Sequence, residues 1–95
     1  MKVRAHIFVY GRVQGVYFRS YTRNAARNLG INGWVRNNRD GSVEAVFEGE
    51  ETGVIEIVEW CRKGPPVAAV DSVDLEWQEY KGEFDDFAVT YGYRF

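Results

Sequence analysis

The fold of this chain can be predicted from residues 3–29, which read VRAHIFVYGRVQGVYFRSYTRNAARNL. The first eight of these residues place an aliphatic side chain at every second position, which predicts a β-strand with one buried face. Glycines at positions 11 and 15 interrupt the alternation. Apolar or small side chains then recur at helical spacing, at Phe18, Thr22, Ala25 and Leu29. Gly30 is placed to end this helix, so the stretch predicts a strand, a glycine-containing loop and a helix.

The rest of the chain contains the same two periodicities. Alternation predicts strands over residues 34–37, 43–47 and 73–77, and a last strand containing Phe87, Val89, Tyr91 and Tyr93. Turn residues at 38–41 join the first two of these strands into a hairpin. A second helix is predicted over residues 51–63, and Gly64-Pro65-Pro66 ends it because proline cannot continue a helix.

This order of elements predicts an α+β fold, the ferredoxin-like βαββαβ sandwich, with residues 1–95 as one domain. We expect an antiparallel sheet with core strand order 4-1-3-2, two helices on one face and an extra C-terminal strand. The first two strands are joined through a helix and so run parallel, with the third strand between them. Their C-terminal ends then lie on the same edge of the sheet. The loop after the first strand and the end of the second become neighbours there.

Composition limits the classes of function. Hydrophobic residues make up 45% of the chain, enough for one core, and no apolar run approaches the roughly 20 residues that span a bilayer. Cys61 is the only cysteine, which excludes an internal disulfide and a thiolate metal cluster. We therefore expect a cytoplasmic protein without a membrane partner. The formal charge is −2, yet eight of the 12 basic residues lie in positions 1–40, a local basic field that suits a small anion.

The first candidate site segment is residues 11–19, GRVQGVYFR. A glycine-containing turn between a strand and a helix can point several backbone N–H groups at an anion, and the helix N-terminus adds more. Gly15 permits a positive φ, and Arg19 can reach back over the loop with a guanidinium that fits two phosphoryl oxygens. From spacing alone, an ordinary turn with a surface arginine is the alternative.

The second candidate segment is residues 33–37, GWVRN, followed by Gly41-Ser42-Val43 and Gly49. Asn37 lies where the second predicted strand ends, on the edge that carries the loop. A carboxamide offers a donor and an acceptor, so it can hold a water while contacting a phosphoryl group. An asparagine that merely starts a turn is the alternative.

Both segments resemble the signature motifs of acylphosphatases. Residues 11–19 match Gly-x-Val-Gln-Gly-Val-x-Phe-Arg, and residues 33–49 match Gly-Trp-Val-x-Asn followed by Gly-x-Val and a glycine. Gly64-Pro65-Pro66 and residues 70–73 also resemble the family. The likeness therefore covers nearly the whole chain.

The resemblance implies hydrolysis of acyl phosphates to carboxylate and inorganic phosphate. It implies that Arg19 binds the phosphoryl group, that Asn37 orients the attacking water, and that a proton passes to a phosphate oxygen of the substrate. It also implies a cradle of backbone amides from Gln14, Gly15, Val16, Tyr17 and Phe18. An acyl phosphate has a weakly basic leaving group, so positioning and charge stabilisation suffice for the reaction, and we expect no metal or cofactor. Separately, we expect the protein to be a monomer.

Two other functions stay open at this point. Phe8 and Tyr10 lie on the strand face opposite Ile7 and Val9, where an RNA-binding module of this fold stacks bases. The net acidity and the missing RNA-recognition motif argue against nucleic acid as a partner. A non-catalytic anion sensor could keep the cradle, but it would need Arg19 and not Asn37. His6, the only histidine, is expected to be a packing or solvent-facing residue.

Overall fold

The computed structural model describes residues 1–91 and contains the predicted elements in the predicted order. They are β1 (Lys2–Arg12), α1 (Phe18–Asn28), β2 (Asn32–Asn37), β3 (Val43–Glu50), α2 (Glu51–Lys63), β4 (Ala69–Gln78) and β5 (Phe87–Val89). The last strand was predicted to include Tyr91 and Tyr93. It ends at Val89, and Tyr93 lies outside the described residues.

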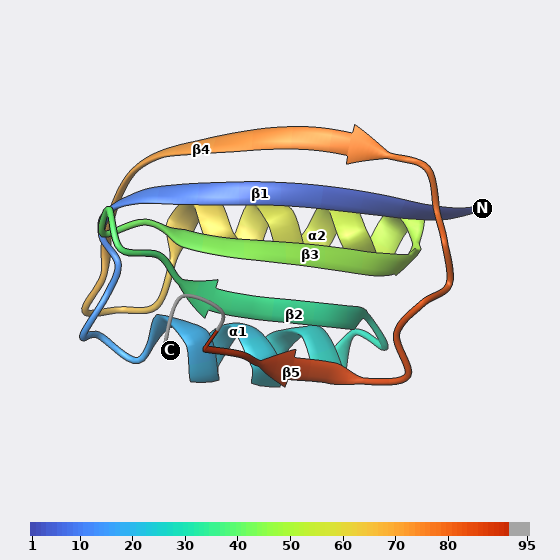
Figure 1. Ribbon diagram of the computed structural model, residues 1–95, viewed down its shortest axis with the longest axis horizontal. Coiled ribbons are helices and arrows are strands. Elements are labelled where there is room, and N and C mark those ends of the chain that lie inside the picture. The colour runs from blue at the N-terminus through green and yellow to red at the C-terminus, as the bar shows by residue number, and fades with distance from the viewer. Residues whose placement is uncertain (92–95) are drawn as a thin grey trace.

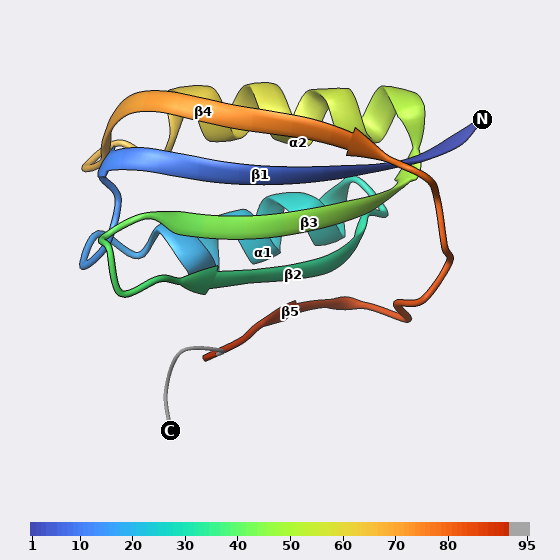
Figure 2. The same cartoon turned by 45° about the horizontal axis from the view of Figure 1, so that its top comes forward.

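The strands form one sheet in the order β4-β1-β3-β2-β5 (Figure 1). The predicted core order 4-1-3-2 is confirmed, and its three pairings are antiparallel. β5 adds a parallel pairing with β2, so the sheet is mixed. The connection over residues 79–86 explains this direction, because it leaves β4 and runs along one end of the sheet to the far edge strand (Figure 2). β5 therefore starts at the end where β2 starts.

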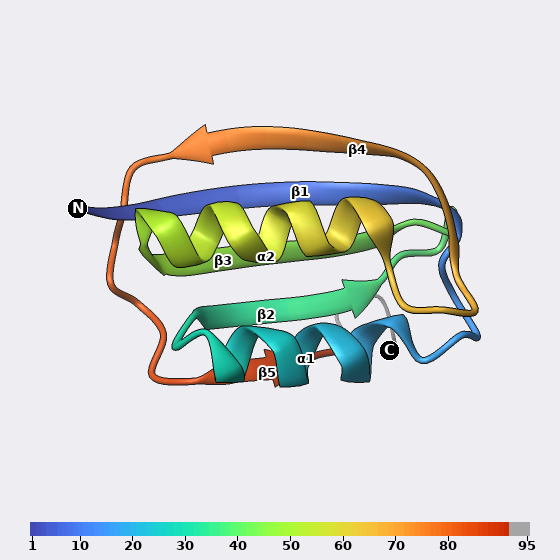
Figure 3. The ribbon, with the colours of Figure 1, turned by 180° about the vertical axis from the view of Figure 1, so that it is seen from behind.

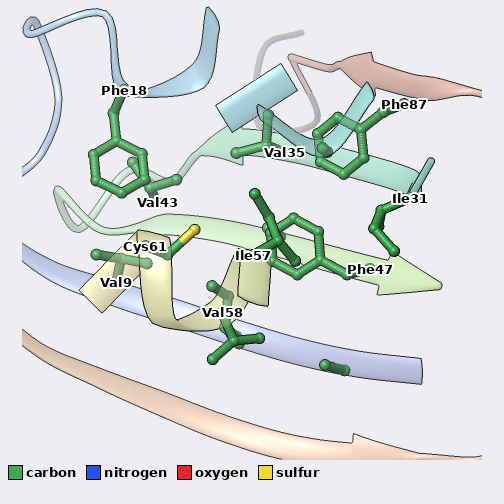
Figure 4. Packing of buried hydrophobic residues seen from close by; sticks show 14 of the residues in the cluster. Val9, Phe18, Ile31, Val35, Val43, Phe47, Ile57, Val58, Cys61 and Phe87 are labelled. Carbon is green, nitrogen blue, oxygen red and sulfur yellow. The ribbon is translucent and has the colours of Figure 1, made fainter. Parts of the chain in front are cut away.

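Both helices cover the same face of the sheet, as predicted (Figure 3). The core lies between these layers, and Figure 4 shows the side chains that fill it. Phe47 of β3 and Phe87 of β5 stack with ring centroids 5.4 Å apart, which fixes the short edge strand against the core. Within residues 1–91, neither helix is long and apolar enough to cross a lipid bilayer.

Cys61 is part of this core and cannot act as a nucleophile. Its side chain is fully buried under α2. Burial raises the pKa of the Cys61 thiol to about 12, although a hydrogen bond with Thr22 opposes the shift. Because the thiolate is the reactive form of cysteine, this side chain has a structural role.

The other face of the sheet carries paired charges. Glu44 is buried there between His6, at 2.6 Å from its Nε2, and Arg36, at 2.9 Å from its Nη2. The ring of His6 also packs against that of Phe8, with centroids 5.1 Å apart. His6 is therefore a half-buried packing residue, as expected, that also pairs with a carboxylate.

Candidate active site

The C-terminal ends of β1 and β2 lie on the same edge of the sheet, where α1 begins (Figure 1). Gly11 allows the end of β1 to lie close to β4, because a Cβ at this position would be only 2.3 Å from the carbonyl oxygen of Ala69. The chain then turns through residues 13–17 before the first turn of α1. This edge therefore holds both candidate segments.

The loop presents unused backbone donors. Gly15 has φ 75° and Tyr17 has φ 62°, both in the left-handed region. Tyr17 is the N-cap of α1, and no side chain caps this end of the helix. The N–H groups of residues 15–19 donate to no acceptor among residues 1–91. Free N–H groups at a helix N-terminus favour an anion, and an anion is the ligand that the sequence led us to expect here.

Arg19 lies in the first turn of α1 and is half-buried. Its guanidinium carbon is 5.1 Å from the centre of the Tyr91 ring, a cation–π contact that restrains the side chain. No carboxylate of the described chain lies within ion-pair distance of it. Among residues 1–91, therefore, no carboxylate neutralises the positive charge of Arg19.

Asn37 is the last residue of β2, where it pairs with Val43. Its side chain is half-buried, and its carboxamide makes no hydrogen bond within the described part of the chain. The preceding residue differs, because Arg36 donates to Glu44 through both Nε and Nη2. Of these two neighbours, only Asn37 keeps its polar groups available.

A single pocket of about 290 Å³ joins the two segments. Its lining residues are Val13, Gly15, Tyr17, Phe18, Arg19 and Asn37. The structure thus brings Arg19 and Asn37 together over the loop, at the small end of the volume range of small-molecule sites. The lining includes no carboxylate, imidazole or thiol. Val13 was missed because a buried apolar residue has no chemical signature in the sequence.

Gln14 and Val16, two residues of the predicted cradle, do not line this pocket. Val16 is buried in the core. The Gln14 side chain donates to the carbonyl oxygens of Asn38 and Ser42, at 2.7 and 2.9 Å. It therefore ties the loop to the turn that directly follows Asn37, a contact that the sequence did not reveal.

The turn that receives Gln14 is itself well ordered by hydrogen bonds. The backbone N–H of Asn38 donates to the carbonyl oxygen of Ser42 at 2.8 Å. The Ser42 hydroxyl and N–H both donate to Asp40 Oδ1. The Ser42 hydroxyl, and next its N–H, hold the pKa of Asp40 below its ordinary value. Gln14 thus joins the loop to a firm support.

No metal centre is evident in residues 1–91, because they contain no group of three or more His, Cys, Asp or Glu side chains arranged to hold an ion. The acidic residues of the described sheet lie elsewhere. Glu44 and Glu48, the two buried acidic residues of the described sheet, pair with basic side chains of β1 and β2 on the open face, which is the face of the sheet that the helices leave uncovered. The candidate site is built instead from one guanidinium, one carboxamide and backbone amides.

The fold and the pocket together define a small ferredoxin-like α+β domain with a cationic pocket at one edge of its sheet. Comparison with known proteins is consistent with this class and narrows it. The family model for acylphosphatases matches residues 5–89. The acylphosphatase of Pelotomaculum thermopropionicum is 53% identical over 90 residues, which cover 95% of this chain and 98% of that protein.

Solved structures agree. The acylphosphatase of Coxiella burnetii superposes with a TM-score of 0.89 and 39% identity, covering 94% of this chain and 93% of that one. The Bacillus subtilis acylphosphatase gives a TM-score of 0.90 and 32% identity over 94% of this chain and 99% of that one. The chain belongs to the acylphosphatase family. Its enzymatic activity is that of a hydrolase of acyl phosphates.

Proposed function

We propose that Arg19 and the loop amides bind the phosphoryl group of an acyl phosphate while Asn37 orients the attacking water. The observation that supports this proposal is the shared pocket, which Arg19 and Asn37 line from two different elements. The guanidinium and the N–H groups of residues 15–19 supply positive charge and donors without competing protein acceptors in residues 1–91. The carboxamide of Asn37 can accept a hydrogen bond from water and donate one to a phosphoryl oxygen.

In the proposed reaction, the water oxygen attacks phosphorus and the bond from phosphorus to the acyl oxygen breaks. The acyl group leaves as a carboxylate, and a proton of the water passes to a phosphate oxygen of the substrate. A carboxylate needs no strong acid to depart. The enzyme therefore contributes orientation of the water and fixed donors for the oxygens of the transition state. The absence of acidic and imidazole groups from the lining is compatible with this division of labour.

We also propose that the reaction needs no metal ion. The enzyme is proposed to be a monomeric, single-domain, cytoplasmic protein without a nucleic-acid partner. An RNA-binding role for Phe8 and Tyr10 would place bases on the open face. Acidic side chains occupy that face next to both aromatic residues. Desolvation, followed by the charges of Asp74 and Asp40, raises the pKa of Tyr10. A negatively charged neighbourhood repels a nucleic-acid backbone.

The decisive experiment measures phosphate release from benzoyl phosphate in excess chelator, with wild type beside Arg19→Ala and Asn37→Ala. We expect wild-type turnover to persist in chelator. Arg19→Ala should lose at least roughly 10²-fold in rate, by analogy with the loss of one oxyanion donor. Asn37→Ala should lose turnover while inorganic phosphate still competes for the site, because Arg19 and the amides remain.

Two control variants remove the same chemical groups from the far end of α1. Arg27→Ala breaks only an exposed ion pair with Asp86, which is worth little, and Asn28→Ala truncates an exposed carboxamide. Both should retain wild-type turnover. Full activity in Arg19→Ala would remove its assigned role. Loss of phosphate binding in Asn37→Ala would make Asn37 a ligand contact and not the residue that orients water.

A further inference from the structure

A second pocket adjoins the candidate active site. It has a volume of about 230 Å³ and is lined by Tyr17, Arg19, Ser20, Arg23, Val89 and Tyr91. Tyr17 and Arg19 also line the first pocket, so the two hollows flank the same guanidinium. A ligand whose phosphoryl group is bound by Arg19 can therefore extend its other half into the second pocket. This step rests on the proposed function of Arg19.

Arg23 gives the second pocket a charge of its own. It follows Arg19 by four residues on α1, so both side chains lie on one face of the helix. It is half-buried and has no carboxylate partner among residues 1–91. Its single hydrogen bond in that range, from Nε to Asn24 Oδ1, is long at 3.5 Å. Like charges at this spacing destabilise a helix, so the pair is costly unless an anion binds it.

Two other arginines that pack on the sheet form ion pairs with carboxylates. Arg4 pairs with Glu48 and Glu83, and Arg36 pairs with Glu44. Even the exposed Arg27, one turn after Arg23 on the same helix, pairs with Asp86. Among the arginines of the two helices, Arg19 and Arg23, which line the pockets, are the two without a carboxylate partner in residues 1–91.

The remaining walls suit a short carbon chain. Val89 is aliphatic, and the rings of Tyr17 and Tyr91 add apolar surface, with Tyr17 76% exposed at the rim. The Ser20 hydroxyl already donates to the carbonyl oxygen of Tyr17 at 3.1 Å. The pocket therefore offers an apolar path that starts at Arg19 and one cation, Arg23, that no carboxylate in residues 1–91 neutralises.

We propose that this second pocket binds the acyl group and that Arg23 binds a further carboxylate on it. The preferred substrates are then acyl phosphates of dicarboxylic acids. The reaction is unchanged: water displaces the acyl oxygen from phosphorus, and the products are inorganic phosphate and a dicarboxylate. Arg23 acts on substrate selection and contributes through binding.

The test compares succinyl phosphate with butyryl phosphate, which has the same four-carbon chain but a methyl group in place of the terminal carboxylate. We expect wild type to favour succinyl phosphate by about tenfold in kcat/KM, the size of one charge-assisted hydrogen bond. Arg23→Gln should lower kcat/KM for succinyl phosphate about tenfold more than for butyryl phosphate, chiefly through KM. Arg23→Lys should retain part of the preference. The preference should also shrink as ionic strength rises.

Lys2→Gln is the matched control, because it removes one positive charge at the opposite end of β1. It should leave both the turnover and the preference unchanged. Equal kcat/KM values for the two substrates in wild type, or an equal loss for both in Arg23→Gln, would overturn the acyl-site assignment while acyl phosphate hydrolysis stands. Hydrolysis of neither substrate by wild type would overturn the proposed function and this inference together.

Discussion

Arginines at opposite ends of the sheet differ in whether they pair with carboxylates. At the end where α1 begins, Arg19 and Arg23 have no carboxylate partner within residues 1–91. At the other end, where the connection over residues 79–86 passes (Figure 1), Arg4 donates to Glu48 at 3.1 Å and to Glu83 at 2.6 Å. Arg4 also donates to the side-chain oxygen of Gln78. We call the end with Arg4 the paired end and the end with Arg19 and Arg23 the open end; Arg36, next to Asn37, instead pairs with Glu44 on the face of the sheet that the helices leave uncovered.

Glu48 shows what the paired end achieves. It is only 2% exposed, and it accepts hydrogen bonds from the N–H groups of Lys81 and Glu83 as well as from Arg4. A buried charge is tolerated when its acceptor sites are used in this way. These bonds hold the connection that leads into β5. The paired end therefore maintains the fold, whereas at the open end the N–H groups of residues 15–19 donate to no acceptor among residues 1–91.

The largest expected effect separates these two roles. Glu48→Ala leaves Arg4 short of one partner and two backbone N–H groups without an acceptor, so the free energy of unfolding should fall by about 3 kcal/mol. The folded fraction should still hydrolyse benzoyl phosphate at the wild-type rate. Urea denaturation and an activity assay on the same preparations measure the two effects. Glu56→Ala, at an exposed site on α2, is the control and should change neither.

A smaller effect tests whether Gln14 holds the loop in position relative to Asn37. Gln14→Leu keeps the approximate size of the side chain but removes both donations, to Asn38 and Ser42. The loop can then shift relative to Asn37, and small misplacements are costly in catalysis. We expect kcat to fall about tenfold, equivalent to about 1.4 kcal/mol, with phosphate inhibition little changed. A variant that loses phosphate binding and retains kcat would show that Gln14 acts on the cradle and not on the water.

The fold was largely predictable because its signals are local or follow from connection rules. The two-residue period of β1 and the helical period of α1 lie within one short stretch. The joint edge of β1 and β2 then follows from a helix connecting parallel strands. The placement of the two candidate segments on this edge was predictable because their glycines and polar residues stand at strand ends, whereas their interpretation as a site came from the resemblance to the acylphosphatase motifs.

The features that sequence reasoning missed depend on tertiary contacts. The direction of β5 depends on the path of the preceding connection, which buried Glu48 fixes from another strand. Only the backbone amide of Gln14 was expected in the cradle, and nothing in the sequence spacing indicates that its side chain points toward the turn after β2. The catalytic roles of Arg19 and Asn37 remain predictions.

The smallest expected effect is the loss of folding stability in acid. Burial by itself raises the pKa of Glu48, but hydrogen bonds from the Lys81 N–H, the Arg4 side chain and the Glu83 N–H more than offset it, and the net pKa lies below its ordinary value of 4.5. Because the folded form binds its proton less readily than the unfolded chain, the stabilisation is complete above pH 4.5 and is lost as pH falls through the lower, folded value.

The wild-type free energy of unfolding should therefore decrease with acid below pH 4.5. Glu48→Gln should be less stable near neutrality yet flatter in acid, by at most about 1.4 kcal/mol per pH unit. Urea midpoints of both proteins, measured from neutral pH downward, give the two slopes. In Glu48→Gln some slope should persist because of Glu44. Burial is the largest single effect on the pKa of Glu44 and raises it, but the hydrogen bonds from His6 and Arg36 together outweigh burial, so the net pKa of Glu44 is lowered. Equal slopes in the two proteins would show that Glu48 is not an acid-sensitive contact of the paired end, and the contrast between the two ends would then rest on geometry alone.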